Sequence, residues 1–100
     1  MPYIKQNTRT TLDPAIDQLV KAIADLELDN LEGGNNTEGN LNYIISRILS
    51  DVYTHPLSNR NINDAVGMLD CCKMEFYRRL AFYEDQKIVE NGDVYPTAHD

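Results

Sequence analysis

The last third of the chain concentrates side chains that could bind an anion. Glu75, Arg79, Tyr83 and Lys87 are spaced four residues apart, so on a helix they would share one face. Arginine forks and tyrosine hydroxyls are suited to a phosphate or carboxylate group. The same spacing is also typical of a solvated helix face, on which each ion pair contributes about 0.2–0.5 kcal/mol. That second interpretation is the more common one, and the sequence leaves both open.

A small anionic nucleotide is the ligand that such a region would suit. The site would combine basic side chains for phosphate with tyrosine rings for stacking, and a subunit interface would bring them together. The predicted ligand-binding residues are Tyr43, Tyr77, Arg78, Arg79, Tyr83 and Lys87.

Aromatic residues beside arginines are also the types that dominate protein interfaces. Gly67 lies inside a helical pattern, where glycine costs about 0.8–1.0 kcal/mol relative to alanine. A helix tolerates that cost where another backbone approaches closely, so we expect the second helix or another copy to cross there. The predicted interface residues are Gly67, Phe76, Leu80, Phe82, Val94 and Tyr95.

Catalytic chemistry finds little support in the sequence. The serines lack a neighbouring base and there is no phosphate-binding glycine motif, so we expect no enzyme, no catalytic residue and no cofactor. A metal-dependent nucleotide hydrolase using Glu84, Asp85 and Asp93 is the least favoured alternative, because such enzymes need paired carboxylates on two helices and the second helix supplies only Asp51. No zinc site is expected either. Cys71 is expected to fill a buried apolar position, as is Cys72.

Composition and charge exclude some partners. The net charge of −7 disfavours a nucleic acid duplex, which requires a basic stripe. No apolar run approaches about eighteen residues, so we expect no membrane partner. The N-terminus lacks the apolar core of a signal peptide, which predicts a cytoplasmic protein.

The elements that would position these residues are three helices, over about 13–29, 40–54 and 61–90, with an exposed loop at 30–39. Asp13 is the expected N-cap of the first helix, with Pro14 at its first position. His55–Pro56 should end the second helix and Asn91–Gly92 the third. The sequence therefore predicts one all-α domain over 1–100: a three-helix bundle of two shorter helices and a long C-terminal one, with extended tails.

The length of the third helix bears on assembly. Its thirty residues would span about 45 Å at about 1.5 Å per residue, whereas a compact domain of this size is roughly 33 Å across. Either the helix breaks near Leu80–Phe82, or another subunit covers its far end. We expect that another subunit covers the far end of the helix, and therefore that the protein is a homo-oligomer.

Several short motifs together resemble those of a known family: Met1–Ile4, Gly39–Ile45, Glu75–Arg79, Tyr83–Lys87 and Glu90–Tyr95. The chain is similar over nearly its whole length to small uncharacterised proteins of bacteria, archaea and their phages. The resemblance implies a prokaryotic host cytoplasm and a phage-associated accessory protein, but no activity. Because small helical phage proteins often sequester host molecules, it also implies an alternative: an anti-defence sponge for a small, cyclic nucleotide signal.

Overall fold

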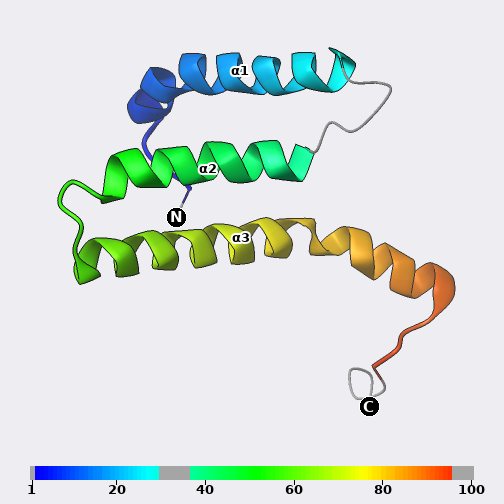
Figure 1. The fold of residues 1–100 in the computed structure, drawn as a ribbon. Coiled ribbons are helices and arrows are strands. Elements are labelled where there is room, and N and C mark those ends of the chain that lie inside the picture. Colours follow the sequence, from blue (N-terminus) through cyan, green and yellow to red (C-terminus); the bar gives the residue numbers. More distant parts are fainter. Residues whose placement is uncertain (1, 30–36, 96–100) are drawn as a thin grey trace. The chain divides into compact units, whose positions relative to one another are not determined.

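The computed structural model describes residues 2–29 and 37–95, and within these ranges it contains three α-helices and no β-strand. The helices are α1 (Gln6–Asp29), α2 (Thr37–Tyr53) and α3 (Asn59–Asn91), as Figure 1 shows. The predicted all-α, three-helix class is therefore confirmed. None of the described helices combines the length and apolar character that crossing a membrane requires.

The chain forms two compact units, Met1–Ala65 and Val66–Asp100, so α3 begins in one unit and continues in the other. The first unit contains α1, α2 and the first turns of α3. The second contains the remainder of α3 and, as far as the structure describes it, a short tail to residue 95.

The start of α1 differs from the prediction, because α1 begins at Gln6 rather than near residue 13. The backbone N–H groups of Thr8 and Arg9 both donate to the carbonyl of Lys5, at 3.1 Å in each case. The Arg9 side chain adds a bond from Nε to the carbonyl of Ile4, at 2.9 Å. These bonds build a helical turn well before the Asp13–Pro14 pair.

The prediction that Asp13 is the N-cap is therefore wrong, and Pro14 lies inside α1. An internal proline removes one backbone hydrogen bond and crowds the carbonyl four residues earlier, here that of Thr10. Thr10 and Thr11 each donate a side-chain hydrogen bond to the carbonyl four residues before them, at 3.0 and 3.2 Å. Such back-bonding bends helices, and Figure 1 shows the dark-blue start of α1 at an angle to the rest.

Within the first unit, α1 and α2 pack against each other. Thr37 Oγ1 donates to Glu27 Oε1 at 3.0 Å and so joins the start of α2 to the last part of α1. Of the predicted loop, residues 30–36 lie outside the described residues and 37–39 belong to α2. Glu38 stands in the first turn of α2, where the helix dipole favours a negative charge.

The connection from α2 to α3 is short. α2 ends at Tyr53, just before His55–Pro56. Ser58 caps α3, because its Oγ accepts the backbone N–H of Asn61 at 3.1 Å. Asn61 Nδ2 also donates to the carbonyl of Pro56 at 2.7 Å, which fixes the turn before the helix.

α3 contains 33 residues, so at about 1.5 Å per residue it is about 50 Å long. It runs without interruption through Leu80–Phe82, where a break was one expectation. Figure 1 shows its ribbon curving in the yellow-to-orange stretch. Gly92 ends it as predicted: it adopts a φ of 94°, and its N–H donates to the carbonyl of Ile88 at 2.8 Å.

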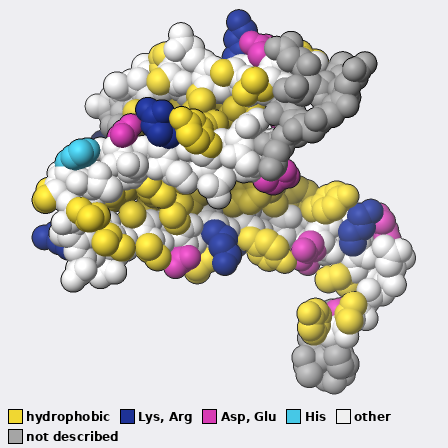
Figure 2. Space-filling model, viewed as in Figure 1, with side chains coloured by type: hydrophobic (Ala, Val, Ile, Leu, Met, Phe, Trp, Pro, Cys, Tyr) yellow, Lys and Arg dark blue, Asp and Glu magenta, His cyan; other side chains and the backbone are white. Residues whose placement is uncertain are grey.

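Apolar side chains are largely exposed. Among the described residues only Ala65 is buried, at 8% exposure. Hydrophobic side chains accordingly reach the surface over all three helices (Figure 2). Cys71 and Cys72 are both exposed, so the expectation that they are buried is wrong. The physical reason is that the described part of the second unit contains one helix and a tail, which leaves it no second helix of its own to pack against them.

Candidate functional site

The predicted ligand-binding residues fall into the two units. Tyr43 lies on α2 in the first unit. Tyr77, Arg78, Arg79, Tyr83 and Lys87 lie on α3 in the second unit. All six are exposed, so each is available to solvent.

Arg78 binds a carboxylate of its own helix. Its Nη2 contacts Glu75 Oε1 at 2.8 Å, and its Nε donates to Glu75 Oε2 at 3.3 Å. The contact joins residues three apart, and a pair of this spacing stabilises a helix by about 0.2–0.5 kcal/mol. The sequence had placed Glu75 on the face of Arg79, whereas the structure pairs it with Arg78.

A hydrogen bond between Tyr77 and Glu84 spans two turns of α3. The Tyr77 hydroxyl donates to Glu84 Oε2 at 2.5 Å, two helical turns away. This bond and the negative charge of Glu84 raise the pKa of Tyr77, with smaller contributions from Tyr95 and Asp85. The phenol is therefore held in its neutral, hydrogen-donating form.

Tyr83 and Lys87 place a ring beside a cation. Lys87 Nζ lies 5.5 Å from the centre of the Tyr83 ring, within the range of a cation–π contact. The same ammonium contacts Glu90 Oε2 at 3.3 Å. Ring and ammonium thus lie on one exposed face.

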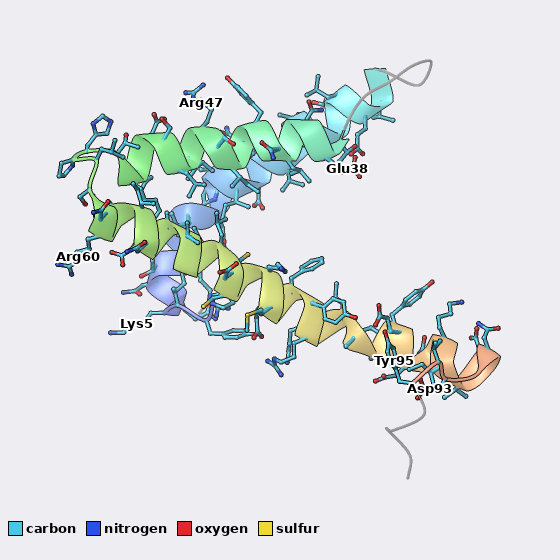
Figure 3. The ribbon with its side chains drawn as sticks, turned by 60° about the horizontal axis from the view of Figure 1, so that its bottom comes forward. Lys5, Glu38, Arg47, Arg60, Asp93 and Tyr95 are labelled. Carbon is cyan, nitrogen blue, oxygen red and sulfur yellow. The ribbon has the colours of Figure 1, made fainter. Side chains whose placement is uncertain are left out.

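The first unit repeats this arrangement around Tyr43. Arg47 Nη1 donates to the Tyr43 hydroxyl at 3.1 Å, and its guanidinium carbon lies 6.0 Å from the ring centre. Arg47 Nη2 also lies 3.8 Å from Asp51 Oδ2. Figure 3 shows Arg47 extending away from α2. The sequence interpretation missed Arg47, although its spacing of four residues from Tyr43 was a usable signal.

One hollow lies within the second unit. It is a depression open to solvent, with a volume of about 470 Å³, and it is lined by Lys73, Met74, Tyr77, Arg78 and Ala81, all from α3. Two predicted ligand-binding residues, Tyr77 and Arg78, therefore share a concave surface with apolar neighbours. Tyr83 and Lys87 are not among the residues that line it.

The predicted interface residues are also exposed. Their role in an interface stays a prediction. Apart from the neighbouring backbone of α3 itself, no described atom lies within 4 Å of a Cβ built on Gly67, so the described part of the chain supplies no close crossing backbone there. An approach by another copy stays a prediction. Val94 and Tyr95 are 84% and 74% exposed, and the backbone N–H of Tyr95 donates to Asp93 Oδ1 at 2.9 Å. Figure 3 shows Asp93 and Tyr95 beside the last part of α3.

The acidic residues of the hydrolase alternative serve other contacts. Glu84 accepts the Tyr77 hydroxyl, and Asp93 accepts the backbone N–H of Tyr95. Within residues 2–29 and 37–95, no three side chains of the metal-binding types come together. These contacts give the hydrolase alternative no support.

Searches against curated proteins and against solved structures found no match to this chain. A family model did match, and it covers residues 1–94, which is nearly the whole length. That agrees with the resemblance to an uncharacterised family. The chain belongs to the family described as a domain of unknown function, DUF6899.

Proposed function

We propose that this protein is a non-enzymatic helical module that works as a homo-oligomer and binds or assembles through α3 and its tail. The observation that carries the proposal is the exposure of its apolar residues. Only Ala65 is buried among the described residues, while Phe76 is 69% exposed and Phe82 58% exposed. Folded proteins gain most of their stability by removing such surface from water.

The second unit makes the argument most directly. Isolated helices are only marginally stable in water, and packing of an apolar face supplies most helical stability in proteins. The described part of this unit has one helix, which presents Met74, Phe76, Leu80 and Phe82 to solvent. Packing by other copies would supply the missing burial.

The test is the mass of the protein in solution over a range of concentrations. Sedimentation equilibrium should give a multiple of 11.4 kDa. Thermal stability should also rise with protein concentration, because association stabilises the folded state by mass action. A constant mass of 11.4 kDa with a melting temperature independent of concentration would refute the proposal.

A second candidate is a sponge for a small anionic nucleotide, and the pairing of Tyr83 with Lys87 favours it. An exposed ring 5.5 Å from an ammonium offers a stacking surface beside a positive charge. Two other predicted residues are already engaged within the chain, Arg78 by Glu75 and Tyr77 by Glu84. A nucleotide would have to share or displace these contacts, so we rank this function second.

Thermal shift with cyclic and linear nucleotides separates the two functions. A ligand present at about a hundred times its Kd should stabilise the protein by about 2.7 kcal/mol. Lys87→Gln should reduce that shift, and Lys21→Gln, on α1, is the matched control. The phage association and the anti-defence role that the resemblance implied stay predictions, and an absence of any shift would count against the sponge.

A further inference from the structure

The hollow on the second unit belongs to a longer apolar face of α3. Met74, Tyr77, Ala81 and Ile88 recur at intervals of three, four and seven residues, so they share one side of the helix. Met74 and Tyr77 are 65% and 59% exposed. The described part of the unit has no other helix to cover this face, and beside α3 it has only the short tail to residue 95.

We propose that a second copy of the chain packs its α3 antiparallel against this face, with a two-fold axis near Ala81–Phe82. The inference rests on the proposed homo-oligomer and specifies its contact. The same apolar residues would then meet in both directions, as a two-fold interface requires.

The distribution of charge selects the antiparallel orientation. Basic residues precede the axis and acidic residues follow it: Lys73, Arg78 and Arg79 come before, and Glu84, Asp85 and Glu90 come after. In an antiparallel pair, the basic half of one helix lies opposite the acidic half of the other. Parallel copies would place like charges level, which is unfavourable.

Arg78 and Asp85 are the charges that flank the face. They are seven residues apart, which returns to nearly the same angular position on a helix. Each lies about the same distance from the axis, so Arg78 of one copy would meet Asp85 of the other, and the pair would occur twice. Arg78 already contacts Glu75, and a guanidinium with five N–H donors can bind two carboxylates.

Three charges of the second unit's part of α3 do not follow the pattern: Asp70, Glu75 and Lys87. Asp70 precedes the axis and would oppose the orientation, whereas the other two exceptions, Glu75 and Lys87, are matched within their own helix. Glu75 precedes the axis and contacts Arg78 at 2.8 Å. Lys87 follows the axis and contacts Glu90 at 3.3 Å. These local pairs reduce the repulsion that Glu75 and Lys87 would otherwise cause.

The test is a charge exchange followed by sedimentation equilibrium of the full chain. Arg78→Asp and Asp85→Arg should each weaken association about tenfold or more, because each places like charges opposite one another. The double variant should restore association to near the wild-type value. Lys21→Asp, on α1, is the control, since it reverses one charge outside the proposed contact and should leave association unchanged.

A disulfide checks the register without depending on the charges. In a Cys71→Ser, Cys72→Ser background, Ala81→Cys should oxidise to a covalent dimer, because Cα atoms near the axis fall within disulfide reach, about 4.4–6.8 Å. Arg79→Cys, on the opposite side of the helix, should not.

The outcomes separate this inference from the proposed function. Wild-type protein that stays at 11.4 kDa would overturn both. Wild-type protein that associates would sustain the homo-oligomer. If the double variant then fails to restore association and Ala81→Cys fails to cross-link, the antiparallel contact is wrong, and another face joins the copies.

Discussion

The two units handle their apolar residues in different ways. In the first unit α1 and α2 pack against each other, and Ile23, Ile44 and Leu49 become half-buried. In the second unit the apolar residues of α3 stay exposed from Val66 to Val89 with few exceptions. The difference teaches that two helices with apolar stripes cover part of each other within one unit, whereas a single helix with apolar residues on several sides needs neighbours from outside its unit.

A proline in the second unit should have the largest effect. Ala81→Pro removes a backbone hydrogen bond and clashes with the preceding turn, at a cost of about 3 kcal/mol or more. α1 accommodates Pro14, and in the turns before it the threonine hydroxyls donate to the carbonyls of Gln6 and Asn7. Circular dichroism should show lost helix and sedimentation should show a monomer.

Ala81→Gly is the matched control for that change, with an expected cost of about 0.8–1.0 kcal/mol and no loss of association. Retained association in the proline variant would contradict the view that the second unit carries the assembly.

A truncation in the first unit should have an intermediate effect. Ile44→Ala should cost about 1–2 kcal/mol, below the range of about 2–5 kcal/mol for buried residues, because Ile44 is only half-buried. Urea denaturation measures the loss. Val52→Ala, at a position 64% exposed, should cost less. Equal costs would show that the α1–α2 contact is not the core of its unit.

Two glycines of the second unit should respond in opposite directions. Gly92→Ala should destabilise the end of α3 by about 1–2 kcal/mol, since its φ of 94° strains any residue with a Cβ. Gly67→Ala should stabilise the helix by about 0.8–1.0 kcal/mol, because a Cβ there would meet no described atom within 4 Å apart from the neighbouring backbone of α3 itself. Thermal denaturation measures both.

A destabilising Gly67→Ala substitution would be the more informative result. It would place another copy against Gly67, as the sequence interpretation expected, and would move the contact away from Ala81–Phe82.

The smallest predicted effect concerns pH. Glu84 raises the pKa of Tyr77 in the folded protein, so this bond contributes stability fully below the pKa of an unfolded tyrosine, about 10. The contribution is lost as the pH rises through the higher folded value. An ultraviolet titration should show one tyrosine that ionises at a higher pH than the others, and this transition should be absent in Tyr77→Phe. Glu84→Gln should shift the transition to lower pH. If the high-pH transition persists unchanged in Glu84→Gln, Glu84 is not the cause of the raised pKa of Tyr77.

Local signals predicted part of this fold well. Periodic apolar residues predicted three helices, and Gly92 predicted where α3 ends. The Asp13–Pro14 signal failed because the turn built on Lys5 starts the helix earlier. Cys71 and Cys72 were misplaced because burial depends on what packs around a helix, which a helical pattern does not specify. For the same reason the sequence placed Arg78 in a basic region but did not predict its contact with Glu75.

The adjacent thiols of Cys71 and Cys72 have a practical consequence. Neighbouring helical positions point about 100° apart, so the two exposed sulfurs sample different sides of α3. The alkylation rate of each cysteine, measured by peptide mass spectrometry, would report the accessibility of each side separately, without any engineered label. Slowed modification at one sulfur as the sample is concentrated would map, on the native molecule, which side becomes shielded.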